Sequence, residues 1–303
     1  MSHQPDNPVP LFGSGPRRSL NPTAAGIVLG TELRRMRAER RLTATRAATL
    51  INASVSKVSR LERAESPPDP RDIEILADAY GVNPAERAQL RSLTRRAREP
   101  EWFDRYTDCA ASWMQRLIAL ESDAVYYCAY EARLAPGLLQ TPEYARQIIS
   151  DGLRLSEGDR VEQRVLLRQE RQRRFFGQPA PPVARFLLDE SVLHRQVGTP
   201  AVMAGQLRKL LEYSDRPGVT LLVVPLNSSV VSNHGSMAHL RFASGGPPAM
   251  VFIEGDDDAM YYVKPDEVER RVEVMLRLSH EAAVPWRDSR AILLDALKRY
   301  EDG

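Results

Sequence analysis

The sequence contains very little cysteine and no long apolar run. Its 303 residues include two cysteines, Cys109 and Cys128, which are too few for a disulfide framework, and no CxxC pair of the kind that binds zinc. No segment approaches the roughly 18–20 apolar residues that a membrane-spanning helix requires, and residues 1–22 lack the apolar segment of a secretory signal. We therefore expect a cytoplasmic protein that has no membrane partner.

Short motifs of common enzymes are absent as well. The chain has no G-x-S-x-G nucleophile elbow, no phosphate-binding P-loop and no G-x-G-x-x-G motif. His234 and His239 could bind a metal together with Asp256, Asp257 or Asp258, but a metal site also needs outer-shell support, and a polar loop beside a hairpin tip explains the same residues. We therefore expect no catalytic residues, no bound metal, no cofactor and no enzymatic activity.

The net charge of +2 hides an uneven distribution along the chain. Residues 1–100 contain 17 Lys and Arg against 11 Asp and Glu, whereas the remainder contains 25 against 29. Within residues 17–63 there are 11 basic residues and 3 acidic ones. A basic N-terminal part joined to an acidic body is typical of a nucleic-acid-binding module attached to a second domain.

Residues 1–98 divide into a tail and a helical domain. Residues 1–22 are rich in Pro, Gly, Ser and Asn without periodicity, so we expect a disordered tail. Apolar periodicity and capping residues then predict an all-α domain of five short helices over residues 23–98. The helices are expected near residues 26–40 and after Thr43, Ser54, Asp69-Pro70 and Asn83-Pro84, with Gly81 ending the fourth.

Residues 99–303 have a different pattern, which predicts an α+β domain with an antiparallel or mixed sheet. Strands are expected at residues 125–132, 183–190, 219–226, 237–243, 249–255 and 259–263, and the last three are close enough to be antiparallel neighbours. Helices are expected within residues 101–124 and at 141–149, 156–176, 265–282 and 287–301. We expect this domain to serve dimerisation, partner docking or ligand sensing.

The segment SVSKVSRLERAE, which begins at Ser54, has the features of a DNA-recognition helix. Ser54 is a favourable N-cap, and Val58 and Leu61 lie three residues apart, so they can bury one side of the helix. The opposite side carries only hydroxyls and cations, namely Ser56, Lys57, Ser59, Arg60 and Arg63. A short preceding helix with Ala47 and Ala48 at the crossing completes a helix-turn-helix, whose second helix fits the major groove. A solvated surface helix is the alternative, but the combination of five helices, small residues, cap and basic charge favours the helix-turn-helix.

The residues of this region also carry a family resemblance. The stretch LTATRAATLINASVSKVSRLERAE, residues 42–65, resembles the helix-turn-helix of Cro and lambda-repressor-type regulators, the XRE family, and the similarity extends over about residues 26–90. Shared features are the leucine-threonine start, Ala48, the Ser54 cap and the run VSRLER at residues 58–63. The resemblance implies a five-helix, lambda-repressor-like domain that binds double-stranded operator DNA, usually as a dimer.

The resemblance also implies roles for individual residues. Bases would be contacted by Val55, Ser56 and Arg60. Phosphates or nearby base edges would be contacted by Ser54, Lys57, Ser59 and Arg63. Arg37 and Glu62 align with a structural ion pair between the first and third helices. The sequence departs from the family at Ala44, where glutamine is common, and at Asn52, where glycine is common, although asparagine can adopt the left-handed conformation of a turn.

The second part resembles a different family. The segments APGLLQTPEYAR, DESVLHRQVG, QLRKLLE and VTLLVVPL, which begin at residues 135, 189, 206 and 219, recur in an uncharacterised domain behind helix-turn-helix modules of actinomycete transcription regulators. The similarity covers roughly residues 105–300. Some members are described as antitoxin-like, because a small partner protein is encoded beside them.

Two further features of the second part lead to expectations. The arginine-rich helix DRVEQRVLLRQERQRRFF, residues 159–176, is expected to be a solvated helix with internal Glu–Arg pairs, and a surface for DNA flanks or an acidic partner is the alternative. Trp102, Phe103, Tyr106 and Trp113 are expected to pack in a core or between domains. Together with the last two helices they also offer apolar material for a homodimer.

The sequence therefore predicts a sequence-specific DNA-binding transcriptional regulator, dimeric through residues after Pro100. The alternative is an antitoxin-like interaction module that mainly binds a small partner protein, with DNA binding secondary. A small-molecule effector of the second domain is also compatible with the sequence.

Overall fold

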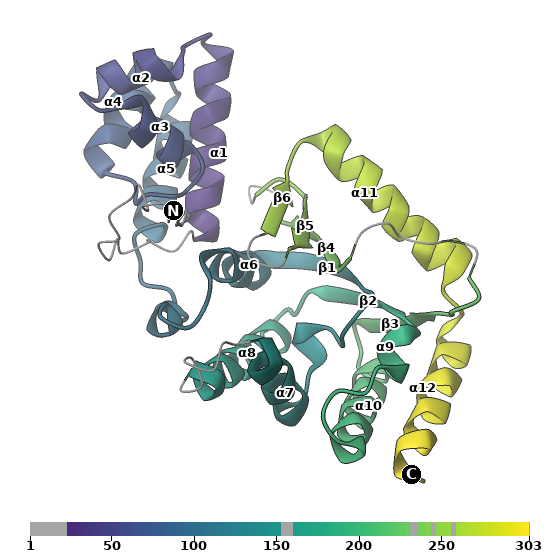
Figure 1. The fold of residues 1–303 in the computed structure, drawn as a ribbon. Coiled ribbons are helices and arrows are strands. Elements are labelled where there is room, and N and C mark those ends of the chain that lie inside the picture. The colour runs from purple at the N-terminus through teal and green to yellow at the C-terminus, as the bar shows by residue number, and fades with distance from the viewer. Residues whose placement is uncertain are drawn as a thin grey trace, which may run out of the picture.

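The computed structural model describes residues 23–152, 160–228, 230, 235–243, 247–255 and 259–302. The expected tail at residues 1–22, His234 and residues 256–258 lie outside the described residues. A group of helices at the N-terminus is followed by a larger part that combines one sheet with helices (Figure 1). Both fold-class predictions are therefore confirmed.

The N-terminal part consists of five helices that share one core. Their bounds are α1 Ala24–Glu39, α2 Ala44–Leu50, α3 Val55–Glu62, α4 Pro70–Tyr80 and α5 Pro84–Arg96. Leu29 and Leu33 of α1 pack against Val58 and Leu61 of α3, and Tyr80 at the end of α4 is fully buried among them. Burial of these side chains is the main favourable contribution to holding such short helices together, because isolated helices of this length are marginal in water.

Local capping sets where these helices begin, as the sequence predicts. Thr43, Ser54, Asp69 and Asn83 each accept a hydrogen bond of 2.9–3.1 Å from a backbone N–H in the first turn of the following helix. Gly81 ends α4 with φ of 61°, a left-handed conformation that glycine adopts without steric cost.

The larger part is built on a six-stranded mixed sheet with strand order β3-β2-β1-β4-β5-β6. The strands are β1 Ala124–Glu131, β2 Val183–Asp189, β3 Val219–Val224, β4 Met237–Phe242, β5 Met250–Glu254 and β6 Ala259–Tyr262. β1, β2 and β3 are parallel, whereas β4, β5 and β6 continue the sheet in antiparallel pairs, as predicted for the last three. The remaining helices are α6 Ser112–Asp123, α7 Pro142–Gly152, α8 Val161–Phe176, α9 Ser191–His194, α10 Pro200–Ser214, α11 Pro265–Arg277 and α12 Trp286–Glu301, with short 3-10 turns at Asp104–Tyr106 and Gly137–Leu139 and a π-helical turn at Leu278–Ala282.

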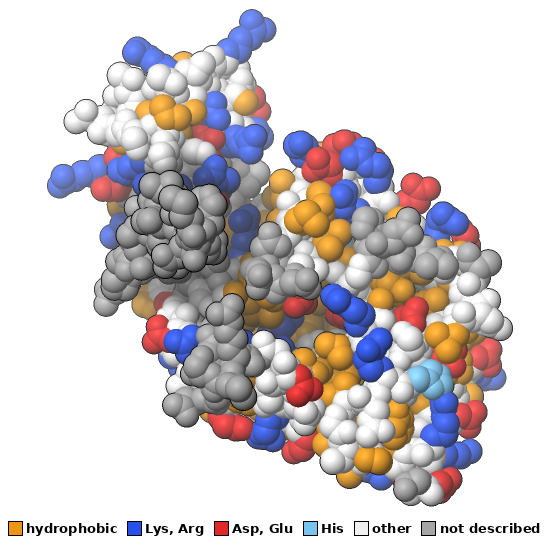
Figure 2. Space-filling view, in the orientation of Figure 1, with side chains coloured by type: hydrophobic (Ala, Val, Ile, Leu, Met, Phe, Trp, Pro, Cys, Tyr) orange, Lys and Arg blue, Asp and Glu red, His pale blue; other side chains and the backbone are white. Residues whose placement is uncertain are grey.

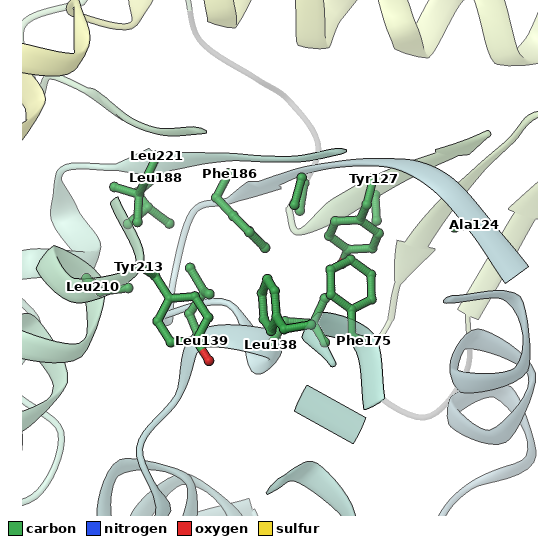
Figure 3. Close-up of a cluster of buried hydrophobic side chains, with 14 of the residues drawn as sticks. Ala124, Tyr127, Leu138, Leu139, Phe175, Phe186, Leu188, Leu210, Tyr213 and Leu221 are labelled. Atoms are coloured by element: carbon green, nitrogen blue, oxygen red, sulfur yellow. The ribbon is translucent and has the colours of Figure 1, made fainter. Parts of the chain in front are cut away.

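Helices cover both faces of this sheet (Figure 1). Helices α6, α8, α10 and α12 contribute to the core on one face, and α7 packs on the outside of α8. Figure 3 shows part of this core, in which Tyr127 and Phe186 project from the sheet toward Leu138 and Phe175. The alternate residues of β1, Cys128 and Tyr130, face the other side and pack with α11 and the π-helical turn.

Two helices of this part differ from the sequence-based expectation. Helix α10, whose start is capped by Thr199, is not predicted, although a Thr-Pro pair begins it as one begins α7. Helix α8 is only partly solvated. Glu170 forms ion pairs with Arg173 and Arg174 on the exposed side as expected, but Arg171 is buried between α8 and α6.

The aromatic residues after Pro100 pack within the chain. Phe103 is buried, with Trp102 and Tyr106 against it, and Trp113 stacks on Phe252 of the sheet with ring centroids 6.0 Å apart. The expectation of core packing is confirmed for these four aromatic side chains. Phe103 is therefore not available for a dimer interface, and neither are Leu278 of the π-helical turn and Leu293 and Leu297 of α12, whereas the other three aromatic side chains are partly buried.

Candidate nucleic-acid interface

Helices α2 and α3 meet at a tight turn, and small residues allow their close packing. Ala47 and Ala48 are buried at the crossing, and Val58 and Leu61 bury the inner side of α3. The turn contains Asn52, whose φ of 49° is left-handed, so asparagine supplies the conformation that the turn requires. This arrangement of two short helices is a helix-turn-helix with α3 in the position of the recognition helix.

Helix α3 is also held very close to α1. A Cβ atom at Gly30 of α1 would lie 2.6 Å from the carbonyl oxygen of Glu62 and 2.8 Å from that of Leu61. No side chain fits there without moving the C-terminal end of α3. Sequence reasoning did not single out Gly30, and the signal that could have found it is a glycine inside an otherwise regular helical pattern.

The predicted ion pair between α1 and α3 is present in the structure. The Nε and Nη2 atoms of Arg37 lie 2.5 and 2.8 Å from the two carboxylate oxygens of Glu62. Both side chains are mostly buried, and the hydrogen bonds that Arg37 donates to Glu62 raise the pKa of the guanidinium above its ordinary value. The two parallel hydrogen bonds of the pair fix the orientation of α3 on α1.

Three residues on the outer side of α3 are exposed and make no side-chain hydrogen bond or ion pair with the described residues. They are Val55, Ser56 and Arg60, the residues for which base contacts were predicted. Ser56 and Arg60 lie four residues apart and so share one face of the helix. A guanidinium and a hydroxyl that are solvated and unpaired can approach base edges without first breaking a contact.

The other four predicted contact residues are engaged within the protein. The hydroxyl of Ser54 accepts from the backbone N–H of Lys57, whose ammonium lies 2.6 Å from a carboxylate oxygen of Asp72. Arg63 donates to both carboxylate oxygens of Glu65 at 2.8 and 2.7 Å and to the hydroxyl of Ser59. These hydrogen bonds lower the pKa of the Glu65 carboxyl, so the partner of Arg63 stays negatively charged.

The structure adds one basic residue that the sequence reasoning missed. Arg46 is exposed in the first turn of α2, and its side chain has no partner within the described part of the chain. Because the first helix of a helix-turn-helix crosses the DNA backbone, a cation there is placed for a phosphate. The sequence feature that could have identified Arg46 is its position three residues after the Thr43 cap, in the first turn of the helix. Figure 2 shows blue basic side chains projecting from this end of the molecule.

The metal site considered from the sequence is not tested, because His234 and residues 256–258 lie outside the described residues. Within the described ranges, no helix is long and apolar enough to cross a membrane, and no three His, Cys, Asp or Glu side chains are grouped to hold a metal ion. His239, one of the two histidines considered from the sequence, lies in β4 against the ring of Tyr126. Burial lowers the pKa of His239 to about 4, so the imidazole is neutral near pH 7.

Comparison with protein families agrees with this division of the chain. Residues 28–90 match a helix-turn-helix domain, which covers most of α1, all of α2 to α4 and the first half of α5. Residues 114–295 match the family described as a domain of unknown function, DUF5753, which covers the sheet and most helices around it. Searches of curated proteins and of solved structures gave no match. The chain is a member of the DUF5753 family that carries an N-terminal helix-turn-helix domain.

Proposed function

We propose that this protein is a sequence-specific transcriptional regulator of the Cro and lambda-repressor (XRE) type, which reads operator DNA with α3 in the major groove. The observation that carries the proposal is the exposed, unpaired side of α3 with Ser56 and Arg60, on a helix held in place by Gly30 and by the Arg37–Glu62 pair. Arg60 is suited to pair with guanine, and Ser56 to contact a neighbouring base edge or phosphate.

The remaining cations would contact phosphates. Lys57 and Arg63 each have a carboxylate partner in the free protein, so binding would exchange Asp72 and Glu65 for phosphate oxygens. Arg46 adds a further cation on α2. Phosphate contacts give affinity and salt dependence but little sequence information, so these residues would set how tightly the protein binds rather than where.

We further propose that the regulator acts as a homodimer. One recognition helix reads too few base pairs to distinguish an operator from competing genomic DNA. Two copies related by two-fold symmetry would place two α3 helices about one DNA turn, ~34 Å, apart on a palindromic site. With Phe103 and the inner side of α12 buried, the apolar side chains that stay exposed on the larger part include Leu276 of α11 and Trp286 and Leu294 of α12.

Selection of binding sites from a random DNA library tests the proposal. The full-length protein should enrich a palindrome, and Arg60→Ala should weaken binding to it by about 1–3 kcal/mol while relaxing the preference at one base pair of each half-site. The matched control is Arg208→Ala on α10, an exposed arginine of the other domain that pairs with Glu301. Failure to enrich any sequence, or an Arg60→Ala protein with unchanged preference, would contradict the proposal.

One observation favours the alternative of an antitoxin-like module for a small partner protein. β6 is an edge strand of the sheet, and it carries the exposed side chain of Met260, with exposed Val263 directly after it. Exposed edge strands can take up a strand from another protein. Met260→Lys should abolish binding of such a partner and leave DNA binding unchanged, and co-purification of the wild type and the variant with a candidate small protein would show it.

A further inference from the structure

A cavity of about 370 Å³ lies between the sheet and helices α6 and α8, on the side of the sheet that faces α8. Its wall includes apolar residues of the sheet, such as Tyr127 and Phe252, and Met114 and Leu117 of α6. The volume is within the range of small-molecule sites, which usually occupy about 300–1,000 Å³. Figure 2 shows a hollow in this face of the larger part, with basic and apolar side chains around it.

Charged side chains of both signs line this cavity, and most form no ion pair with a residue that the structure describes. Arg171 is neutralised by Glu121, with nitrogen–oxygen distances of 2.6 and 2.7 Å. Arg133, Arg168 and Arg195 also line the wall, and none forms an ion pair with a described residue. Arg168 is half-buried, whereas Arg133 and Arg195 are exposed, so the cavity opens to solvent beside guanidinium groups that can pair with an anionic group.

Two carboxyl groups line the same cavity without a cationic partner among the described residues, Glu131 at the end of β1 and Glu254 at the end of β5. Both lie near the arginines but make no ion pair with them. Desolvation raises the pKa of Glu131 to about 8 and also raises that of Glu254, and desolvation lowers the pKa of Arg168 to about 10. The cavity therefore carries an excess of positive charge beside hydrogen-bonding carboxyl groups.

Hydrogen bonds hold the Arg168 side chain in a defined position in the cavity wall. Its guanidinium donates to the side-chain oxygen of Gln140, and Gln140 in turn donates to the Ala135 carbonyl at 2.7 Å. Gln172, one helical turn further along α8, donates to the carbonyl oxygens of Gly137 and Gln140 at 2.9 Å each. This network holds the arginine in place, and its remaining N–H groups make no hydrogen bond with a described residue, so they can donate to a ligand.

Helix α6 connects this cavity to the DNA-binding part. Met114 and Leu117 line the cavity, while Leu117 and Leu120 belong to the same core as Ile27 of α1 and Ala64 after α3. At its C-terminal end Asp123 lies 3.6 Å from Arg96 of α5. A movement of α6 on ligand binding would therefore be transmitted to α1, which carries α3 through Gly30 and Arg37.

We propose that this cavity binds a small amphoteric molecule, with an anionic group held by Arg133 and Arg168 and a cationic or hydrogen-bond-donating group held by Glu131 and Glu254, and that α6 transmits its binding to α3. The second half of the proposal rests on the proposed DNA-binding function, whereas the first half does not. The protein would thus be a regulator whose operator affinity depends on a metabolite.

Three probes test the proposed binding site. Phosphoethanolamine carries both an anionic and a cationic group, whereas inorganic phosphate and ethanolamine each carry one of them. Isothermal titration of the full chain should give saturable binding of phosphoethanolamine, at least tenfold tighter than that of phosphate or ethanolamine. Absence of saturable binding at 20 mM, or equal affinity for phosphate alone, would overturn the proposed site. Both results are independent of DNA.

Variants locate the binding in the cavity. Arg133→Gln and Glu254→Gln change exposed side chains that make no hydrogen bond with a described residue, so both proteins should fold, and Arg168→Met tests the held arginine. Each arginine variant should bind phosphoethanolamine at least tenfold more weakly, and Glu254→Gln should remove its advantage over phosphate. The control Arg270→Gln on α11, across the sheet, should bind as the wild type does. Unchanged binding in all three cavity variants would place the probe elsewhere and overturn the assignment.

The proposed transmission from the cavity to α3 is tested by titrating the protein with selected operator DNA, with and without saturating phosphoethanolamine. Operator affinity should change at least fivefold, the lower range of allosteric coupling, and Arg133→Gln should abolish the change. An unchanged operator affinity with proven probe binding would overturn the transmission through α6 but leave the site. A protein that binds the probe and no DNA would overturn the proposed function alone.

Discussion

Arg37 joins three segments of the DNA-binding part: its guanidinium contacts both oxygens of Glu62 on α3, and its Nη1 donates to the carbonyl of Leu42 before α2 at 2.8 Å. Removing either charge would leave the other partly buried without its partner. We expect Arg37→Met and Glu62→Met each to destabilise the protein by about 2–4 kcal/mol, and the double variant to lose less than the sum, with a coupling of about 1–3 kcal/mol. Urea unfolding of the four proteins measures the coupling, and additive losses would show that the pair has no structural role.

Arg63 and Glu65 should have opposite effects on DNA binding. Arg63→Ala removes a phosphate contact, so it should weaken binding to all sequences alike and reduce the salt dependence by about one ion. Glu65→Gln releases Arg63 and removes a negative charge, so it should tighten binding to all sequences. Fluorescence anisotropy with operator and random DNA at several salt concentrations measures both. If Arg63→Ala weakened binding to the operator but not to random DNA, Arg63 would instead contact a base.

A single methyl group at Gly30 should disturb the placement of α3. Gly30→Ala puts a Cβ 2.6 Å from a backbone carbonyl of α3, so we expect a loss of at least about 2 kcal/mol and weaker operator binding. Gly205→Ala in α10 is the matched control, because nothing lies within 4 Å of its Cβ and alanine is the better helix former by about 0.5–1 kcal/mol. Thermal unfolding compares the two, and equal stability of both variants would refute the close contact.

The oligomeric state should depend on residues after Pro100. The full-length protein is expected to be a homodimer, and a chain ending at residue 98 a folded monomer with weak, salt-sensitive DNA binding. Truncation exposes Ile27 and Ala64, which are buried against the larger part, so some loss of stability is also expected. Light scattering of both proteins gives the masses. A monomeric full-length chain would contradict the prediction, as would a dimeric fragment with full operator affinity.

Glu131 should make the stability of the protein fall as pH rises. Its pKa of about 8 in the folded protein lies above the ordinary value of 4.5, so between these pH values the folded state binds more protons than the unfolded state. The free energy of unfolding then decreases with pH, by up to about 1.4 kcal/mol per pH unit. Glu131→Gln removes this slope, so relative to the wild type it should gain stability from pH 5 to pH 8.

The comparison between wild type and Glu131→Gln isolates the group from its neighbours. Ser236 donates to the carboxyl, and Glu254, Arg133 and Arg171 lie near it. His239 acts in the opposite direction below pH 6.5, because its pKa is lowered and the unfolded chain binds the extra proton. This contribution is common to both proteins and cancels in the difference. Parallel stability curves for the two proteins would show that Glu131 ionises normally.

The parts of the fold that depend on neighbouring residues were predictable, and those that depend on distant residues were not. The caps at Thr43, Ser54 and Asn83 act over three residues, so the sequence alone shows them. The partner of Arg171 is Glu121, 50 residues away, so a buried arginine was mistaken for a solvated one. A helix between β2 and β3 would have indicated parallel strands, but α10 was not recognised.

In the candidate DNA-binding site, too, features set by neighbouring residues were predictable and contacts with distant residues were not. Which residues of α3 point outward follows from helical periodicity, whereas the carboxylates that hold Lys57 and Arg63 lie outside the helix. Asp72 belongs to α4, and its contact depends on how α4 packs in the five-helix core. The cavity was beyond prediction, because its wall combines strands, α6, α8 and loops that only the folded sheet brings together.

The position of β1 in the middle of the sheet has a consequence for synthesis on the ribosome. β1 ends at Glu131, but one of its two neighbours, β4, begins only at Met237. The five N-terminal helices have local contacts and can fold once Arg96 has left the exit tunnel, whereas β1 must wait with one open edge until β4 is made. A nascent chain stalled between Glu131 and Met237 would therefore contain a folded helix-turn-helix followed by an aggregation-prone strand. Expression should then depend on chaperones that protect this strand.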